Sequence, residues 1–405
     1  MESRNAWFPV ALAGLVLAWG GNHFTPLLLV YRERYGYSEF DATIFFAIYA
    51  IGVIPGILAA GPISDRYGRK PVLLVGVIAG IVGSAVIGFG SSSAWAIDIG
   101  RLVVGGSVAI AMTVATTWIK ELSSAVPAAT AARRASVALT IGGAGTVVSG
   151  ALAQWGPRPL LTPYVVQGLL ALIAGAMAVF TPETRQRSTA PGPGFRNLVP
   201  ARPHRRRFLL VVLPGALWVF TANALAVVVG PSLAAERLGD RKVAYATLMT
   251  VLMIGSGVAF QRALGWAIRV TRGRPLIAGL GLIQAGLLAL MLASAADIVW
   301  PTALAAVLLG AGYGITIISG LIEVQAMADP KHLGGLTSAY YAITFTGFGV
   351  PAALAVFTEV VPTSLLLLAM ALLCGACSLV AAIASVRLPR VDPDVRVGSQ
   401  LKASA

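Results

Sequence analysis

Residues 61–71, which read GPISDRYGRKP, form the stretch that decides how this chain folds. Long apolar runs stand on both sides of this short, basic stretch. A glycine lets a helix end approach a neighbour closely. An acid at a membrane boundary needs a partner, such as a helix N-terminus or an arginine. The residues of interest are Gly61, Asp65, Arg66, Gly68, Arg69 and Lys70.

Composition makes lipid the solvent for most of the surface of this chain. The mean hydropathy is +0.82 and only 11% of the 405 residues are charged. Many of the 45 glycines stand inside apolar runs, which suits transmembrane helices that pack through small residues. The net charge of +14 does not indicate nucleic-acid binding, because the cations lie between apolar runs. We expect an integral membrane protein that contacts lipid and no nucleic acid.

Apolar runs long enough to cross a bilayer occur twelve times, in two sets of six. The first set is 7–30, 42–60, 72–90, 96–118, 136–156 and 161–180. The second set is 208–231, 243–261, 276–294, 300–322, 337–358 and 363–386. We therefore predict an all-α membrane protein with twelve transmembrane helices in two pseudo-symmetric six-helix bundles. The predicted division is 1–182 and 208–386 for the bundles, 183–207 for a basic cytoplasmic linker, and 387–405 for a cytoplasmic tail.

Lysine and arginine favour one side of this predicted topology. If the N-terminus is cytoplasmic, most of them fall in cytoplasmic loops and tails, and this bias predicts that both termini are cytoplasmic. We expect a bacterial inner membrane as the location. The cations left in the opposite loops are Arg32, Arg34, Arg158, Arg237, Arg241 and Lys242.

A weak internal repeat supports two parallel halves. Residues 265–275 read GWAIRVTRGRP and run from Gly to Pro over the same length as residues 61–71. Repeats of this kind are typical of secondary transporters. Arg269 stands where Asp65 does, and Arg272 stands where Gly68 does. Any role that depends on the acid should therefore belong to residues 61–71 and not to residues 265–275.

The pattern G-x-x-x-D-R-x-G-R-K resembles the signature loop of the major facilitator superfamily. The two six-span halves, the basic linker and the PET sequence at residues 182–184 agree with this resemblance. It implies the major facilitator fold, with Asp65 and Arg69 in a latch that holds the two halves in one access state. The alternative is that Arg66, Arg69 and Lys70 only set the topology.

A second motif, Arg101-x-x-x-Gly105, lies in the fourth span. It resembles the arginine element of drug:proton antiporters, although the fifth span lacks the Gly-Pro element of that subfamily. An arginine in a membrane should face the interior, and Asp98 can pair with it at i, i+3. A proton relay, a substrate counter-charge and a structural ion pair all remain open for these two residues.

Two other titratable groups are candidates for proton coupling. His23 has an intrinsic pKa suited to this role, but a neutral histidine hydrogen-bonded near the outer interface is the alternative. Glu323 is a membrane carboxylate if its helix runs one turn deeper than drawn, and otherwise a hydrated helix end.

Polar and aromatic residues within the spans are candidates to line a substrate cavity. The alternative for the amides is a bridge between two helices, and for the aromatic rings simple packing. The candidates are Asn22, Gln154, Asn223, Gln284, Tyr313, Tyr340, Tyr341 and Phe345.

Taken together, these features predict a secondary transporter that works by alternating access. We expect proton-coupled export of small lipophilic or amphiphilic compounds by a monomer. Import or facilitated passage of a small nutrient is the alternative, and a non-transporting receptor or lipid-handling protein is a rival of another class. No nucleotide-binding loop, metal-ligand cluster or nucleophile motif is present, so we expect no enzyme activity, cofactor or metal.

Overall fold

A computed structural model describes residues 5–124, 126, 128–143, 145–185, 204–327 and 333–388. The described residues form helices and no strand. Ten segments among them are long and apolar enough to cross a membrane. They are Trp7–Tyr35, Glu39–Tyr67, Arg69–Phe89, Ala94–Glu121, Thr162–Val179, Arg205–Arg262, Pro275–Ala296, Trp300–Met327, Gly335–Phe357 and Thr363–Arg387.

The difference between ten segments and twelve predicted spans has two local causes. The fifth predicted span falls on two helices, α7 (Ala128–Gly142) and α8 (Gly145–Trp155), each shorter than a bilayer requires. The seventh and eighth both lie within Arg205–Arg262, a helical segment of 58 residues that turns at Gly239. The count of twelve therefore stays a prediction.

The helix boundaries follow local chemistry. Ser38 and Asp41 form a capping box at the start of α3, and Gly68, with φ of +100°, ends α3 and lets α4 begin at once. The earlier helices are α1 (Trp7–Asn22), α2 (Leu28–Tyr35), α3 (Glu39–Tyr67), α4 (Arg69–Phe89), α5 (Ala94–Ile110), α6 (Thr116–Glu121) and α9 (Thr162–Val179). The later ones are α10 (Arg205–Arg207), α11 (Leu213–Ala224), α12 (Gly230–Leu238), α13 (Lys242–Arg262), α14 (Leu264–Val270), α15 (Pro275–Ala296), α16 (Trp300–Met327), α17 (Leu333–Phe345), α18 (Val350–Phe357) and α19 (Thr363–Arg387).

Glycines bring the central helices of each half into close contact. Gly52 and Gly105 lie where α3 crosses α5, and a Cβ on either would collide with the backbone of the other helix. Gly310 and Gly314 of α16 meet α13 in the same way. Such crossings gain dispersion energy because two backbones touch directly. The two crossings lie about half a chain apart, which agrees with the weak repeat in the sequence.

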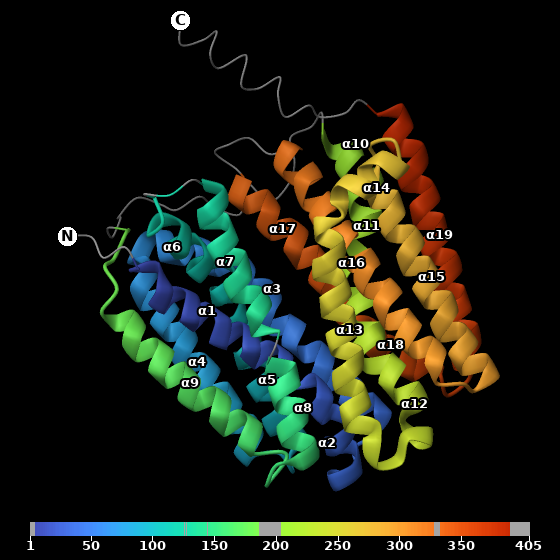
Figure 1. The fold of residues 1–405 in the computed structure, drawn as a ribbon, viewed down its shortest axis with the longest axis horizontal. Coiled ribbons are helices and arrows are strands. Elements are labelled where there is room, and N and C mark those ends of the chain that lie inside the picture. The colour runs from blue at the N-terminus through green and yellow to red at the C-terminus, as the bar shows by residue number, and fades with distance from the viewer. Residues whose placement is uncertain are drawn as a thin grey trace, which may run out of the picture.

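The helices form two groups side by side (Figure 1). Helices α1 and α3–α9 lie in one group, and α11–α19 lie in the other. We call the described residues from 5 to 185 the first half, and those from 204 to 388 the second half. The end of the molecule with α2, α8 and α12 is the closed end, and the end with α6, α10 and α17 is the open end. Most of the predicted linker and tail, residues 186–203 and 389–405, lies outside the described residues.

Candidate transport pathway and its two ends

Polar contacts join the two halves at the closed end. The side chain of Gln154 on α8 donates to the carbonyl of Asp240 at 2.8 Å and accepts from the backbone N–H of Ala244 at 3.1 Å. Lys242 forms an ion pair with Glu33 at 2.9 Å. Since these contacts all cross from one half to the other, they seal this end. We call them the outer seal.

The hydrogen bonds of Gln154 match one of the two roles that the sequence left open for it. We expected its amide to line a central cavity or to bridge two helices, and the structure shows the bridge. Its amide nitrogen and its amide oxygen both form hydrogen bonds near the start of α13, where the first N–H groups of a helix have no partner within the helix. Close packing supports the bridge, because a Cβ on the nearby Gly150 would collide with Thr247.

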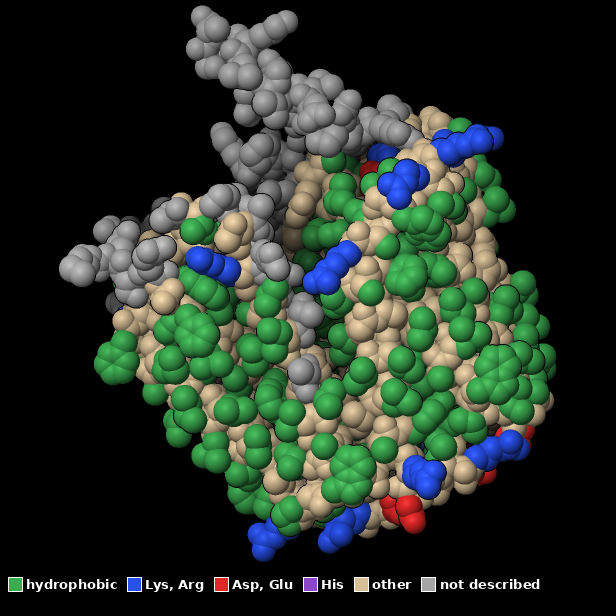
Figure 2. Space-filling view, viewed as in Figure 1, with side chains coloured by type: hydrophobic (Ala, Val, Ile, Leu, Met, Phe, Trp, Pro, Cys, Tyr) green, Lys and Arg blue, Asp and Glu red, His purple; other side chains and the backbone are tan. Residues whose placement is uncertain are grey.

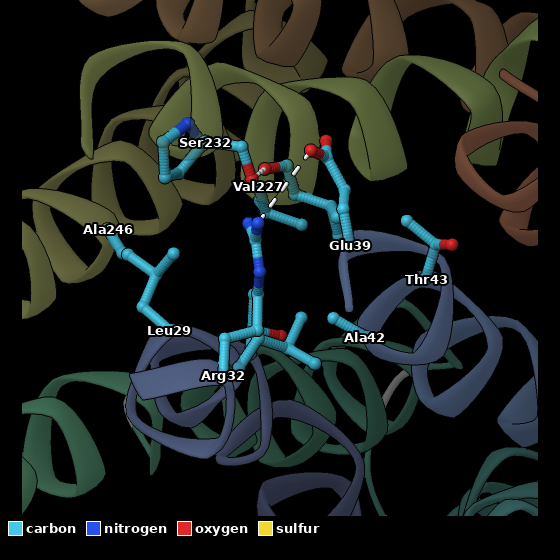
Figure 3. Close-up of a pocket in the computed structure, with 12 residues that line it drawn as sticks. Leu29, Arg32, Glu39, Ala42, Thr43, Val227, Ser232 and Ala246 are labelled. Atoms are coloured by element: carbon cyan, nitrogen blue, oxygen red, sulfur yellow. Dashed lines mark hydrogen bonds and ion pairs between the residues drawn. The ribbon is translucent and has the colours of Figure 1, made fainter. Parts of the chain in front are cut away.

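A small pocket lies beside the outer seal, between α2, α3 and the second half (Figure 3). Arg32 and Glu39, 3.8 Å apart, border it from the first half, and Val227 and Ser232 border it from the second. Its volume of about 10 Å³ is enough for about one water molecule. This pocket is therefore too small for a substrate.

Replacing Gln154 with leucine should loosen the outer seal. The change keeps the side-chain size and leaves the Asp240 carbonyl and the Ala244 N–H without their partner across the halves. We expect faster labelling of an Ala246→Cys reporter by an impermeant maleimide in right-side-out vesicles, because Ala246 is buried at this end. The reporter requires removal of Cys374 and Cys377, the two native cysteines.

The control for this experiment is Gln284→Leu. It makes the same chemical change on α15, where Gln284 lies against Gly375 of α19 within the second half. Equal labelling rates in the two variants would show that Gln154 does not hold the outer end closed.

At the open end the molecule is hollowed between the two halves (Figure 2). Between this hollow and the outer seal lies a set of aromatic rings from both halves. Phe46 stacks on Phe348 with centroids 4.8 Å apart, and Phe220 stacks on Phe345 at 4.2 Å. We call the set the aromatic barrier. Its members are Phe46 and Tyr49 of α3, Phe220 of α11, Tyr313 of α16, Phe345 of α17 and Phe348 of the 3-10 turn Thr346–Gly349.

The structure separates the candidate cavity residues into two sets. Tyr313 and Phe345 belong to the aromatic barrier, and Tyr341 packs against the same core. Tyr340 does not line the pathway: it is fully buried within the second half, where its hydroxyl donates to the carbonyl of Ile317 at 3.1 Å. Gln284 does not line it either, because it faces α19.

The two asparagines contact neighbouring helices. The side chain of Asn22 donates to the carbonyl of Ala18 in its own helix, and the backbone carbonyl of Asn22 accepts from the hydroxyl of Thr146 on α8 at 3.1 Å. Asn223 donates to the sulfur of Met253 on α13 at 3.2 Å. The amide of Asn223 thus joins two helices of its own half, which is the alternative that the sequence left open, whereas the amide of Asn22 bonds within its own helix.

Arg101 lies deep in the first half, with 1% of its surface exposed. Its Nε donates to the carbonyl of Phe45 at 3.0 Å, and its guanidinium lies over the rings of Phe24 and Tyr49, 4.3 and 4.5 Å from their centroids. A pair with Asp98 does not form, so this expectation was wrong. Arg101 points towards α1 and α3, and Asp98 lies one turn nearer the closed end, where its Oδ1 has no hydrogen-bond partner.

His23 is completely buried, just beyond the end of α1. Its ring meets the edge of Tyr164, with centroids 4.8 Å apart, and neither ring nitrogen has a hydrogen-bond partner. The expected alternative of a hydrogen-bonded histidine is therefore not what the structure shows.

The signature loop at the open end forms a dense ion-pair network. Arg69 contacts Asp65 at 2.8 Å and Glu121 at 2.9 Å, and it donates to Ser64 at 2.6 Å. Glu121, the last residue of α6, thus joins the loop between α3 and α4 to the end of the fourth predicted span. Within the described residues, the hydrogen bonds and ion pairs of the loop all stay in the first half.

Glu183 is a functional residue of this loop that sequence reasoning missed. Its carboxylate accepts from the backbone N–H groups of Arg69 and Lys70, at 3.0 and 2.8 Å. These are the first N–H groups of α4, so Glu183 caps that helix from the segment after α9. Glu183 is the middle residue of the PET sequence at residues 182–184, but the resemblance carried by that sequence does not indicate a capping role.

In the second half, Glu323 also pairs with an arginine at the open end. It lies in the last turn of α16 and forms an ion pair with Arg207 at 2.7 Å. Arg207 also donates to the carbonyl of Leu388 at 3.3 Å. Glu323 is thus a paired acid at the open end, neither a free carboxylate in mid-membrane nor an unpartnered helix end.

Helices long enough to span a bilayer, a seal at one end and a hollow at the other define a multi-pass membrane transporter. A sequence profile of the Major Facilitator Superfamily matches residues 10–350. The chain belongs to this superfamily and is a transporter, not an enzyme.

Similar sequences include transporters of several kinds. The multidrug resistance protein MdtL of Klebsiella pneumoniae is 28% identical over 265 residues, which cover 62% of this chain and 64% of that protein. The D-xylose transporter of Levilactobacillus brevis is 27% identical over 117 residues, 29% of this chain and 25% of that protein. The bacillibactin exporter of Bacillus subtilis is 31% identical over 78 residues, 19% of each chain. The matches therefore span less than two thirds of the relatives' length.

Solved structures support the fold. The nucleoside transporter NupG superposes with a TM-score of 0.71 at 11% identity, over 94% of this chain and 100% of that chain. The peptide transporter POT in complex with sulfate gives 0.74 at 13% identity, over 96% and 95%. At such low identity the likeness concerns the fold alone.

Proposed function

We propose that this chain is a proton-coupled exporter that moves small lipophilic or amphiphilic compounds by alternating access. The observation that carries the proposal is the aromatic barrier, which offers apolar rings from both halves between the hollow and the outer seal. Apolar sites of this kind select ligands with apolar surface. The matches to MdtL and the bacillibactin exporter support the direction.

The proposal includes the finer topology. Twelve spans form two six-helix bundles, residues 1–182 and 208–386, with a cytoplasmic linker and both termini in the cytoplasm of a bacterium. The hollow at the open end then faces the cytoplasm, and the outer seal faces outwards. In this arrangement the protein acts as a monomer, and the network around Asp65 and Arg69 biases one access state.

Flux measurements test the direction and the coupling. In everted membrane vesicles with an acidic interior, we expect uptake of at least one compound from a panel of lipophilic dyes. The uptake should stop when a protonophore removes the pH gradient. Accumulation of the same compound in right-side-out vesicles would overturn the export proposal.

A barrier substitution tests the site itself. Phe345→Ala removes a ring that stacks on both Phe220 and Phe348, so apparent affinity for the transported compound should fall about tenfold. Phe357→Ala is the control, because Phe357 is an exposed ring at the end of α18. Equal apparent affinities in both variants would place the substrate elsewhere.

The second candidate is an importer or facilitator of a small nutrient. The match to the D-xylose transporter favours it, as does a 26% identical stretch of 113 residues in the glucose transporter GlcP of Staphylococcus epidermidis. Against it stands the apolar character of the barrier, because sugar recognition needs several polar groups. Uptake of labelled xylose or glucose by proteoliposomes would favour this candidate.

A further inference from the structure

The charges inside the described part of the chain are unbalanced. The acids lie in loops or near helix ends, the deepest being Asp98 in the second turn of α5 and Glu323 in the last turn of α16. Glu323 is paired with Arg207, and the Oδ1 atom of Asp98 has no hydrogen-bond partner, from Arg101 or any other described residue. Arg101 is thus a buried cation without an acid beside it.

The protein compensates this cation only in part. The guanidinium has five N–H donors, and the structure gives it the carbonyl of Phe45 at 3.0 Å, that of Gly21 at 3.5 Å and two ring faces. Carbonyl dipoles and rings stabilise a cation less than a carboxylate does. A bound anion would supply the missing charge, and a bound cation would add to the excess.

His23 adds a second polar group to the same region. It stands two residues after Gly21, whose carbonyl accepts from Arg101 at 3.5 Å, and its two ring nitrogens have no hydrogen-bond partner although the side chain is fully buried. Buried polar atoms without partners are rare and costly. An oxyanion beside Arg101 could accept a hydrogen bond from this ring.

Tyr49 connects this region to the pathway. One side of its ring faces the guanidinium of Arg101, with the guanidinium carbon 4.5 Å from the centroid. Its ring is also 5.7 Å from Phe348 and 6.5 Å from Phe345, centroid to centroid. Tyr49 is therefore the side chain through which Arg101 adjoins these two rings of the aromatic barrier.

We propose that the transported compound is an amphiphilic organic anion, with an apolar body against the aromatic barrier and an oxyanion bound by Arg101 and His23. This inference rests on the proposed transport function. It assigns Arg101 the role of a substrate counter-charge, one of the three roles that the sequence left open for this residue.

Three probes with the same apolar body test the charge preference. They are 1-naphthylacetate, neutral 1-naphthylmethanol and cationic 1-naphthylmethylammonium, and their binding to the purified full-length protein can be measured by calorimetry. We expect the anion to bind at least about tenfold more tightly than either other probe. Equal or tighter binding of the neutral or cationic probe to the wild type would overturn the proposal.

Substitutions of Arg101 and His23 test whether these side chains cause the preference for the anionic probe. In Arg101→Gln the preference for the anion over the neutral probe should fall below about threefold while the neutral probe binds as before, and Arg101→Lys should restore part of it. If Arg101→Gln does not fold, His23→Leu serves instead, with a smaller expected loss of the same preference. An unchanged preference in a folded variant would overturn the assignment.

Transport of the three probes in proteoliposomes separates the two proposals. Saturable flux of the neutral or cationic probe, with no preference for the anion, would contradict the anion assignment and leave the transport function standing. Tight binding of the anion without flux of any probe would support the anion site and contradict the transport function.

Discussion

Replacing Arg69 with alanine should abolish most of the transport activity. Arg69 is 6% exposed and contacts Asp65, Glu121 and Ser64 at once. Its loss leaves two carboxylates close together without their shared cation, at a cost of about 1–3 kcal/mol since both are partly hydrated. The rate of substrate flux in proteoliposomes should fall by about tenfold or more.

Arg66→Ala is the matched control for this prediction. Arg66 lies three residues away in the same loop, is exposed, and contacts only the ring of Tyr67 among the interactions described. Both substitutions remove one positive charge from the same loop. If the loop only determined topology, the two variants would lose equal activity. Arg69→Lys should fall between them, because lysine keeps the charge but lacks the planar fork.

Gly105→Ala should lower the stability of the protein. The new Cβ would collide with the carbonyl of Tyr49 where α5 crosses α3. Overpacking of this kind costs about 1–3 kcal/mol, because neither backbone can move without disturbing its other neighbours. We expect the midpoint of thermal unfolding in detergent to fall by about 1–4 °C.

Gly106→Ala is the control for this substitution. A Cβ on Gly106 meets no atom within 4 Å, and the gain in helix propensity, up to about 1 kcal/mol, is the same at both positions. Gly106→Ala should therefore leave the midpoint unchanged or raise it. A fall of equal size in the two variants would mean that the close crossing of α3 and α5 does not limit stability.

The sequence predicted the fold class well because hydropathy and charge are local signals. The apolar runs, the glycine content and residues 61–71 were enough to predict a helical membrane transporter, and the family was confirmed over residues 10–350. The sequence predicted one span at 136–156, which the structure divides between α7 and α8. Local signals could not show that Arg205–Arg262 is helical almost without interruption.

The contacts of the candidate site were harder to predict from the sequence than the fold was. Whether Asp98 pairs with Arg101 depends on the rotation of α5 about its axis, which the i, i+3 spacing does not determine. The aromatic barrier combines Phe46 and Tyr49 with rings located hundreds of residues later in the chain. Only the packing of the two halves brings these residues together, and no single span shows that packing.

The contacts of the outer seal are weak enough for small changes in the protein to shift the balance between the two access states. When it opens, the Ala244 N–H, the Asp240 carbonyl and the Lys242 side chain can all bind water, so each contact contributes only about 0.5–1.5 kcal/mol net. A handful of such contacts sums to a few kcal/mol, close to the free-energy difference that moves a two-state equilibrium from mostly closed to evenly divided. The Gln154 amide makes two of these contacts, so its loss should raise the population of the state in which the outer seal is broken.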